Sequence, residues 1–553
     1  MDRCNLFGDI YQPERTARVA VLYDHTQITY EDLRDKTIRT AEALNALGID
    51  PGDRVGILLH DSPEFIASFV AIISLGAIAV PINPALRRED QLFILKDCGA
   101  LAAIIEEPAA ASLFQAPNTL TDLQHLLVVS RDEGGGSASK SGTGGRGPRR
   151  GSPAGVLDPP RNHAQDARAT NPSGGMKVQT LADAQRRQLG REFPSRGSEE
   201  ADAFILYTSG STGEPKGAVH RQSDIFYTNE TFGREVLQLR EGDRLFSSSR
   251  LPFAYGLGNS FTFPLLNGFT TILCREKPTP DVVSRVFKEY RPTIFFGVPM
   301  VYSMLLEHQR KGNELDTSSL RLCVSAGEAL PAQLGKDWEK TFGVEVLDGI
   351  GSTEMLHMFM SNHERDVRYG SSGRLLSGYE ARLVDHEGTP TDPGEAGNLW
   401  IRGASAALRY WQRPETTFET FVDGWVRTGD LYRCDADGFW WHQGRSDDCF
   451  KPTGQWVSPV EVENVLLRHE AVRAAAVVEG FDEHELSCVC AFAVTDGETD
   501  AVERELRTLC ESSLPRFKQP RRYLFVSELP YTATGKVQRF KLREQLRAQR
   551  AAS

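Results

Sequence analysis

Short apolar runs alternate with a helical pattern over the first 130 residues of the chain. The runs at 54–59, 101–105 and 126–129 have the length and composition of buried strands. Residues 31–47, which precede the first of these runs, follow the spacing of an amphipathic helix instead. This alternation predicts a layered α/β domain with a largely parallel sheet.

The most apolar window of the chain runs from residue 65 to residue 80. It contains Ser68 and Ser74, and it is shorter than the roughly 20 residues that a membrane-spanning helix needs. We therefore predict a buried helix followed by a strand, and no membrane contact. Residues 1–5 lead into polar sequence and lack the apolar stretch of a secretion signal.

The pattern breaks between about residues 133 and 175, where Gly, Ser, Pro, Ala and Arg dominate. Within 134–170, six Lys and Arg residues oppose two Asp residues, so the stretch is basic. Such a composition buries too little apolar surface to offset the entropy of ordering, which predicts a disordered surface insertion. Contact with an acidic partner or RNA stays open, although a solvated loop is the simpler interpretation.

Patterned sequence resumes near residue 181 and continues to about residue 443. The segment 397–441 is rich in strand-forming residues and in Gly and Asp turns, which predicts antiparallel strands. With 553 residues the chain is too long for one core. We place the domain boundary after a polar stretch, which gives a large domain at 1–446 and a small one at 447–553.

Charge and cysteine content narrow the class of protein. The formal net charge of -12 argues against a general nucleic-acid-binding protein. Nine cysteines are scattered without a Cys-x-x-Cys pair, which favours reduced thiols and a cytoplasmic protein over a disulfide framework or a zinc site. Cys488 and Cys490 would share one face of a strand, and we interpret both as core residues.

The densest chemical pattern is the glycine-rich run at 207–217, Tyr-Thr-Ser-Gly-Ser-Thr-Gly-Glu-Pro-Lys-Gly. It follows the apolar residues 203–206, so a strand should lead into it. Glycines allow successive backbone N–H groups to converge on an anion, hydroxyls add donors, and Lys216 adds a mobile positive charge. The run predicts a loop that binds nucleotide phosphates. It is not a Walker A motif, because Gly217 follows Lys216 where Ser or Thr is needed; a solvated linker is the alternative.

A second motif, Asp-Gly-Ile-Gly-Ser-Thr-Glu at 348–354, follows the apolar residues 344–347. A turn here can present the Thr353 hydroxyl to a phosphate oxygen and the Glu354 carboxylate to Mg²⁺, a hard cation that prefers oxygen ligands. The structural alternative is a turn in which Ser352 or Thr353 caps a following helix. Both interpretations can hold together.

Three further motifs lie downstream, Thr-Gly-Asp at 428–430, Gly-Arg-Ser-Asp-Asp at 444–448 and Thr-Gly-Lys at 534–536. By itself Thr-Gly-Asp reads as a common turn. In this order, the five motifs resemble those of the adenylate-forming superfamily, which includes acyl- and aryl-CoA ligases, peptide-synthetase adenylation domains and luciferases. The resemblance spans nearly the whole chain apart from the basic insertion. It implies an α/β fold with a large multi-layer N-terminal domain of mainly parallel sheets, a β-rich subdomain, and a small mobile α+β C-terminal domain.

The resemblance also implies residue roles. Ribose contact falls to Asp430, the interdomain hinge to Asp447, and the coenzyme A tunnel to Lys451 and Gly454. The catalytic residues implied are Lys536, Thr353, Glu354 and Lys216, with Glu354 as the metal ligand. The implied ATP- or AMP-binding residues are Thr208, Ser209, Gly210, Ser211, Thr212, Gly213, Lys216, Asp348, Gly349, Ile350, Thr353, Asp430 and Arg445.

Two positions depart from the family pattern. The superfamily usually has an aromatic residue where Ile350 stands, so an aliphatic contact with the adenine base would have to suffice. Pro452 stiffens a loop that is expected to move for the thioester-forming step.

The segments 251–259, 325–331, 354–359 and 532–542 resemble those of benzoate–CoA ligases. Amino-acid-activating relatives place an Asp where Ala254 stands, so an amino-acid substrate is disfavoured. His357 could bind the substrate, or it could be a packed structural residue. The acyl-substrate residues implied by the resemblance are Phe253, Ala254, Tyr255, Gly327, Gly349, His357 and Met358.

The implied activity is that of an ATP-dependent benzoate–CoA ligase, an AMP-forming acid–thiol ligase of aromatic degradation that uses Mg²⁺. Benzoate or a small substituted benzoate would react with ATP to give an aryl adenylate, and coenzyme A would then take the acyl group. Two alternatives remain, an adenylating enzyme that loads a carrier protein and a non-catalytic nucleotide sensor. We expect no nucleic-acid partner, and a homodimer stays open.

Overall fold

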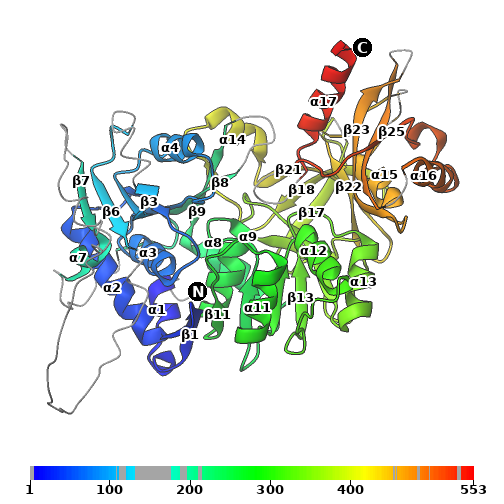
Figure 1. Ribbon diagram of the computed structural model, residues 1–553. Helices are drawn as coiled ribbons and strands as arrows, with labels where there is room; N and C mark the ends of the chain where they lie inside the picture. The colour runs from blue at the N-terminus through cyan, green and yellow to red at the C-terminus, as the bar shows by residue number, and fades with distance from the viewer. Residues whose placement is uncertain are drawn as a thin grey trace, which may run out of the picture.

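The computed structural model describes residues 5–107, 109–110, 120–130, 176–186, 196–208, 214–385, 387–446, 448–452, 455, 457–482, 486–496, 499–531 and 537–552. These residues form a large body with three sheets and a smaller body at the C-terminal end (Figure 1). The α/β architecture predicted from the sequence is therefore confirmed. The basic insertion predicted at about 133–175 lies outside the described residues, and the boundary at 446/447 stays a prediction.

One eight-stranded sheet contains the strands that the N-terminal apolar runs predict. Its order is β19-β9-β8-β4-β3-β5-β6-β7; the strands from β8 to β7 are parallel, and β9 and β19 add an antiparallel edge. The predicted runs correspond to β3, β5 and β6. The strands are β3 (Arg54–Leu58), β4 (Ile78–Pro81), β5 (Ala102–Glu106), β6 (His125–Val129), β7 (Lys177–Thr180), β8 (Asp202–Thr208), β9 (Lys216–Arg221) and β19 (Arg409–Tyr410).

A nine-stranded sheet forms the second layer, in the order β16-β15-β14-β13-β12-β10-β11-β1-β2. Its central strands from β14 to β1 are parallel, and both edges are closed by antiparallel strands. The strands are β1 (Val19–Tyr23), β2 (Thr26–Thr29), β10 (Arg244–Ser247), β11 (Thr270–Ile272), β12 (Ile294–Gly297), β13 (Leu322–Ser325), β14 (Val346–Gly351), β15 (Met358–Ser361) and β16 (Arg374–Leu375).

Helices connect the parallel strands and cover the sheets, as parallel pairing requires. Two of the helical segments, η4 and η5, have π-helical geometry. The helical segments of the large body are α1 (Leu6–Ile10), η1 (Pro13–Arg15), α2 (Tyr30–Ala46), α3 (Pro63–Ser74), α4 (Arg88–Asp97), α7 (Leu181–Arg186), α8 (Gln222–Thr228), η4 (Asn229–Arg234), α9 (Ala254–Leu257), η5 (Gly258–Thr262), α10 (Phe263–Leu266), α11 (Pro280–Tyr290), α12 (Pro299–Arg310), α13 (Ala332–Phe342) and α14 (Pro414–Thr420).

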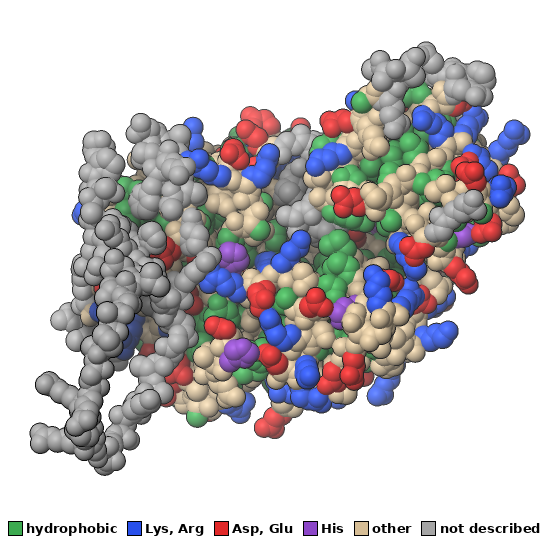
Figure 2. Space-filling model, in the orientation of Figure 1, with side chains coloured by type: hydrophobic (Ala, Val, Ile, Leu, Met, Phe, Trp, Pro, Cys, Tyr) green, Lys and Arg blue, Asp and Glu red, His purple; other side chains and the backbone are tan. Residues whose placement is uncertain are grey.

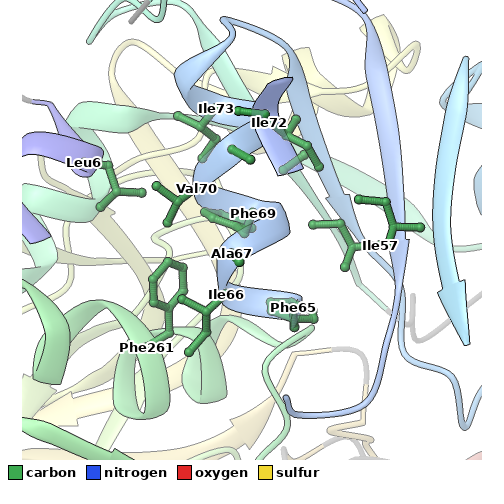
Figure 3. Close-up of a cluster of buried hydrophobic side chains, with 14 of the residues drawn as sticks. Leu6, Ile57, Phe65, Ile66, Ala67, Phe69, Val70, Ile72, Ile73 and Phe261 are labelled. Atoms are coloured by element: carbon green, nitrogen blue, oxygen red, sulfur yellow. The ribbon is translucent and has the colours of Figure 1, made fainter. Parts of the chain in front are cut away.

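The most apolar window of the sequence forms α3 and then β4, which confirms the predicted buried helix and strand. The helix begins after Ser62, whose hydroxyl accepts a hydrogen bond from the Phe65 backbone N–H at 3.3 Å. Figure 3 shows Ile57 of β3 on one side of α3 and Phe261 of η5 on the other. Because it is covered on both sides, α3 is buried over nearly its whole length, which explains why apolar residues occupy most of its positions.

A five-stranded antiparallel sheet joins β17, β18, β21, β20 and β22, as predicted for 397–441. The Thr-Gly-Asp motif is not the turn that its sequence suggests. Residues 428–430 lie inside β21, because Asp430 pairs with Arg445 and Leu431 with Gly444 on β22. The strands are β17 (Glu380–Val384), β18 (Ala396–Arg402), β20 (Phe421–Val422), β21 (Trp425–Cys434) and β22 (Trp440–Arg445).

The smaller body packs helices on a three-stranded sheet, and it lies at the upper right of Figure 1. Cys488 and Cys490 are both buried on β24 with their sulfurs 3.8 Å apart, in agreement with their interpretation as core residues. The elements are α15 (Pro459–Leu466), β23 (Val472–Phe481), β24 (Ser487–Thr495), α16 (Thr499–Ser513), η6 (Arg516–Lys518), β25 (Arg522–Phe525) and α17 (Arg539–Ala552).

Figure 2 shows the surface of the protein in the orientation of Figure 1, where acidic and basic side chains are interspersed among the described residues. No broad face of one sign is visible there. Within the described residues, every helix is too short or too polar to cross a membrane.

Candidate active site

The glycine-rich run leaves one strand and returns on the next. Thr208, the last residue of β8, pairs with Lys216, the first residue of β9. This hairpin brings the two ends of the run side by side, and the predicted strand before the run is confirmed. The intervening predicted residues Ser209, Gly210, Ser211, Thr212 and Gly213 lie outside the described residues.

Lys216 and Glu354 meet at one side chain, that of Tyr410 on β19. The Lys216 ammonium lies over the Tyr410 ring, 5.7 Å from its centroid, within cation–π range. The Tyr410 hydroxyl donates to Glu354 Oε1 at 2.6 Å. Burial and the Glu354 carboxylate raise the pKa of Tyr410, so the hydroxyl stays a donor. The end of the glycine-rich run and the acidic end of the second motif therefore share one site.

His220 of β9 holds the backbone of the second motif by a hydrogen bond. Its Nε2 donates to the Thr353 carbonyl oxygen at 2.8 Å, and its Nδ1 lies 2.9 Å from Asp224 Oδ2. A carbonyl oxygen can only accept, so Nε2 is the donor in the bond to Thr353. His220 and Asp224 are fully buried, which makes this pair a rigid link between β9 and Thr353.

The second motif begins on a strand that runs further than predicted. The strand β14 continues to Gly351, because Gly349 pairs with Ser361 and Ile350 with Met360 on β15. A turn follows, in which Ser352 Oγ accepts from the Met355 backbone N–H at 3.2 Å. The structural alternative, a turn with Ser352 or Thr353 capping a following helix, is correct for the turn and wrong for the helix: within the described residues 346–361 the turn leads directly into β15.

Asp348 lies beneath this turn as a buried acid. Its side chain is 1% exposed, and Oδ2 accepts from the Leu330 backbone N–H at 3.2 Å. Burial raises the pKa of Asp348 to about 8. At Gly349 there is no room for a side chain, since a Cβ would lie 2.2 Å from the terminal methyl of Met358. Met358 itself is a core residue, packed over Gly349.

His357 is surrounded by aromatic rings. The centroids of Phe263, Phe232 and Tyr255 lie 4.6, 4.9 and 5.6 Å from the imidazole centroid. Burial lowers the pKa of His357 to about 3, so the ring is neutral at physiological pH. Nε2 lies 3.2 Å from Oδ1 of Asn259, a residue of the π-helical segment η5.

The other predicted acyl-substrate residues surround this histidine or the strand ends beside it. Phe253 precedes α9, and Ala254 and Tyr255 form its first turn. The Tyr255 hydroxyl donates to the Val324 carbonyl at 3.2 Å, and burial raises the pKa of Tyr255 so that it stays neutral. Gly327 follows β13 as an exposed residue with φ +93°, a conformation that favours glycine.

The predicted ribose residue Asp430 and its neighbour Arg445 lie opposite each other on β21 and β22. Arg445 Nη1 donates to Asp430 Oδ1 at 3.3 Å and to the Thr428 carbonyl at 3.0 Å. His442 Nε2 also lies 3.6 Å from Asp430 Oδ1. The Asp430 carboxylate is thus oriented by Arg445 of the neighbouring strand.

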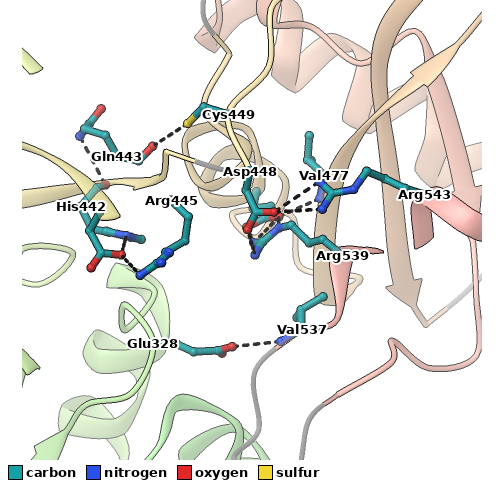
Figure 4. A network of polar contacts seen from close by, with 12 residues as sticks. Glu328, His442, Gln443, Arg445, Asp448, Cys449, Val477, Val537, Arg539 and Arg543 are labelled. Carbon is teal, nitrogen blue, oxygen red and sulfur yellow. Dashed lines mark hydrogen bonds and ion pairs between the residues drawn. The ribbon is translucent and has the colours of Figure 1, made fainter. Parts of the chain in front are cut away.

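The small body touches the large one beside Gly327. The Val537 backbone N–H donates to Glu328 Oε1 at 3.1 Å (Figure 4). Val537 follows the predicted catalytic residue Lys536 in the sequence. Lys536, the predicted hinge residue Asp447 and the predicted tunnel residue Gly454 lie outside the described residues; Lys451 is described and exposed.

Comparison with protein families matches two models to this chain. The AMP-binding enzyme family matches residues 11–411, and the AMP-binding enzyme C-terminal domain matches residues 461–536. The chain belongs to the AMP-binding enzyme family. A benzoate–CoA ligase of Thauera aromatica is 39% identical over 544 residues, which cover 98% of this chain and 95% of that protein.

Solved structures of AMP-binding enzymes share the whole fold. The anthranilate–CoA ligase AuaEII, solved with anthranoyl-AMP, has a TM-score of 0.87 and 36% identity, with 99% of this chain and 98% of that one covered. A benzoate–CoA ligase from Burkholderia xenovorans LB400 has a TM-score of 0.81 and 33% identity over 98% of this chain and 99% of that one.

In this AMP-binding enzyme the structure brings Lys216, Thr353 and Glu354 together around Tyr410 and His220. Asp348 and the His357 ring cluster lie at the two ends of the same β14–β15 hairpin. Asp430 and Arg445 are joined to each other on the five-stranded sheet.

Sequence reasoning missed five residues of this AMP-binding enzyme that support the site. Asn259 and Glu328 lie in the segments 251–259 and 325–331 that resemble those of benzoate–CoA ligases, but the resemblance implies no role for them. His220, Asp224 and Tyr410 lie outside all of the motifs. The β-strand preference of the segments around His220 and Tyr410 places them on strands, but their contacts come from residues far away in the chain. The missed residues are His220, Asp224, Asn259, Glu328 and Tyr410.

The buried neutral His357 predicts an acid-sensitive stability. Below its ordinary pKa of 6.5, the unfolded histidine binds a proton that the folded residue, with a pKa of about 3, does not. The contribution of His357 to stability must therefore fall as pH falls, by about 1.4 kcal/mol between pH 7.5 and pH 5.5, as a difference between the wild type and a variant without this histidine. Urea unfolding of the wild type and His357→Gln at both pH values measures this loss, which should be absent in the variant. Equal losses in both proteins would contradict the assignment.

Proposed function

We propose that this chain is an ATP-dependent benzoate–CoA ligase that acts on benzoate or a small substituted benzoate. The observation that carries the proposal is the meeting of Lys216 and Glu354 at Tyr410. The Tyr410 ring contacts the Lys216 ammonium from the glycine-rich run, and the Tyr410 hydroxyl bonds the Glu354 carboxylate from the second motif. A nucleotide phosphate site needs such a cation and such a carboxylate close together. The relative and the solved structures named for benzoate and anthranilate support an aryl substrate.

The first step joins the aryl carboxylate to the α-phosphorus of ATP and releases pyrophosphate. Two anions must approach each other, so positive charge and hydrogen-bond donors at the phosphates lower the barrier. We assign these tasks to the glycine-rich run with Lys216, to the Thr353 hydroxyl and to Lys536. The rigid link from His220 to the Thr353 carbonyl supports this assignment, because it fixes where the Thr353 side chain starts.

The donor set around Glu354 fits Mg²⁺. A carboxylate and the neighbouring Thr353 hydroxyl are oxygen groups of the kind that this cation prefers. When bound, the ion supplies positive charge to the phosphate oxygens. Glu354 would hold it, with its other role being the acceptor for the Tyr410 hydroxyl.

The C-terminal end of β14 and the β21–β22 pair would contact the nucleoside. Asp348, Gly349 and Ile350 would line the base and α-phosphate side. Asp430, oriented by Arg445, is suited to accept hydrogen bonds from the two ribose hydroxyls. The aliphatic side chain of Ile350 would pack against the flat face of the adenine ring.

The acyl group would lie near α9 and the His357 ring cluster. Phe253, Ala254, Tyr255 and exposed Gly327 would face it, while Met358 acts through Gly349 from the core. Ala254 offers no charge to pair with a substrate ammonium, and His357 is neutral. Such surroundings favour an uncharged ring over an amino acid.

The second step transfers the acyl group from AMP to the coenzyme A thiol. The thiol sulfur bonds to the acyl carbon and the carbon–oxygen bond to AMP breaks. We propose that the small body turns about Asp447 between the steps, which withdraws Lys536 and opens a path past Lys451 and Gly454.

A carboxylate panel tests the proposal. Benzoate, hydroxy-, amino- and halobenzoates, cinnamate and short fatty acids are offered with ATP, and AMP release is measured with and without coenzyme A. We expect benzoate or a monosubstituted benzoate to exceed the fatty acids by about 100-fold or more in kcat/KM, since one well-fitted ring is worth several kcal/mol. Release of AMP should require coenzyme A.

Two other outcomes identify the alternatives. An aryl adenylate that forms but is transferred only to a carrier-protein thiol would identify a loading enzyme. Nucleotide binding without pyrophosphate exchange for any carboxylate would identify a sensor. We further propose a cytoplasmic enzyme of aromatic degradation, consistent with the free cysteines among the described residues. A homodimer stays a hypothesis that size-exclusion chromatography with light scattering would test.

A further inference from the structure

Arg539, the first residue of α17, joins separate parts of the small body through one side chain (Figure 4). Its Nη2 donates to both carboxylate oxygens of Glu463, each at 2.8 Å. Its Nη1 lies 3.6 Å from Oδ2 of Asp448. Arg539 thus connects the start of α17 with α15, which carries Glu463, and with the segment that begins the small body.

The pair with Glu463 is built as a rigid unit. Glu463 is 7% exposed, and its Oε1 also accepts from the Val477 backbone N–H of β23 at 2.7 Å. Burial opposes the charge on Arg539, but Glu463 and Asp448 outweigh it and raise the pKa of the guanidinium. A two-point contact between planar groups fixes orientation as well as distance.

On one side, this unit lies next to the proposed hinge. Asp448 follows Asp447 in the sequence, and its backbone N–H donates to the Arg445 carbonyl of β22 at 3.1 Å. Arg543, one turn further along α17, also contacts Asp448, with both terminal nitrogens at 3.3 Å. The hinge end of the small body is therefore fastened to α17 at two points.

On the other side, the unit lies next to the segment that contains Lys536. The described ends of that segment are closed by a bridge between Tyr531 and Val537 and by the Gln538 backbone N–H, which donates to the Pro530 carbonyl at 2.7 Å. Val537 donates to Glu328 of the large body. Arg539 comes two residues after Val537, so its anchorage bears on the described C-terminal end of this segment.

We propose that Arg539 is a positioning residue, which holds the lysine-bearing segment in register with α15 and the hinge during aryl-adenylate formation. This inference rests on the proposed function. The guanidinium of Arg539 is taken up by Glu463 and Asp448 within the small body. It acts through Glu463 and Asp448, which hold Arg539 and thereby the described end at Val537, where the backbone N–H donates to Glu328 Oε1.

The inference predicts an effect on one half-reaction. Adenylation needs Lys536 at the phosphates, so a shift of the segment by about 1 Å should slow that step by about 100-fold. Transfer to coenzyme A does not use Lys536 in the proposed mechanism. A residue needed only for folding of the small body would slow both steps together.

The test compares Arg539→Lys with Arg543→Lys. Lysine keeps the charge of Arg539 but cannot hold Glu463 at two points. Pyrophosphate release in single turnover should fall about 100-fold in Arg539→Lys. Thioester formation from supplied benzoyl-AMP should stay within about threefold of wild type, and the KM for benzoate should change little, since uniform binding is untouched. Arg543→Lys, which weakens only an Asp448 contact, should leave both steps within about threefold.

A double-mutant cycle separates the contact from general damage. Glu463→Gln should slow adenylation as Arg539→Lys does, and the double variant should be no slower than the worse single variant, because both remove one contact. Equal slowing of both half-reactions, no slowing of adenylation, or additive effects would overturn the inference. Failure of the wild type to adenylate any aryl acid would instead overturn the proposed function, and it is measured first.

Discussion

Replacement of Lys536 by alanine should stop aryl-adenylate formation and leave thioester formation from supplied benzoyl-AMP nearly intact. The loss in pyrophosphate release should be about 100- to 1,000-fold, the usual cost of removing one group that stabilises transition-state charge. Transfer to coenzyme A proceeds from a mixed anhydride whose phosphorus chemistry is complete, so an ammonium at the phosphates gives it no advantage. Single-turnover assays of the two steps measure the two effects separately.

Lys541→Ala is the matched control for this variant. Lys541 lies on α17 of the same small body and is exposed, so its removal should change neither step by more than about twofold. The hydrogen bond from Val537 to Glu328 is made by the backbone and can persist in Lys536→Ala. A variant that lost both steps to the same extent would show that Lys536 supports the fold or the substrate pocket rather than adenylation.

The second large effect is expected for Glu354→Gln. Glutamine keeps an oxygen that can accept from Tyr410 but removes the negative charge that would bind Mg²⁺. We expect the Mg²⁺ concentration for half-maximal pyrophosphate exchange to rise roughly 10- to 100-fold, and the rate at limiting Mg²⁺ to fall accordingly. Titration of pyrophosphate exchange with Mg²⁺ at fixed ATP measures this shift.

Tyr410→Phe distinguishes the charge of Glu354 from its hydrogen bond. This variant removes the donor to Glu354 Oε1 and keeps the carboxylate and the ring beneath Lys216. One hydrogen bond to a charged group is worth about 1.5–3 kcal/mol, so adenylation should slow roughly 10- to 100-fold without a comparable shift in Mg²⁺ requirement. Unchanged Mg²⁺ dependence in Glu354→Gln would exclude Glu354 as the metal ligand.

A buried histidine gives the acyl end of the proposed pocket its polarity. Burial lowers the pKa of His357 to about 3, so its ring is neutral at physiological pH. A pocket end without charge suits an uncharged ring and disfavours a second carboxylate, which would lose its hydration without finding a partner. Phthalates should accordingly be poor substrates in the carboxylate panel.

The sequence by itself determined the fold class and the order of the large elements. Apolar runs at 54–59 and 101–105 predict β3 and β5 because a fully buried strand needs nothing but apolar residues along its length. The window at 65–80 predicts α3 and β4 for the same reason. The motifs from the glycine-rich run to residues 534–536 identified the family, because the types and order of their residues can be recognised even where the local structure cannot be inferred.

Only the tertiary structure decided how the motifs are held together. Tyr410 reaches Glu354 across 56 positions of the chain, and His220 reaches the Thr353 carbonyl across 133. The Thr-Gly-Asp motif resembles a turn by composition, but pairing with β22 makes it a strand, and pairing with β15 extends β14 through Gly351. Burial likewise sets the charge of Asp348 and His357. Each of these outcomes depends on a partner segment distant in the sequence, and local pattern carries no information about which distant segment will supply the hydrogen bond or exclude the water.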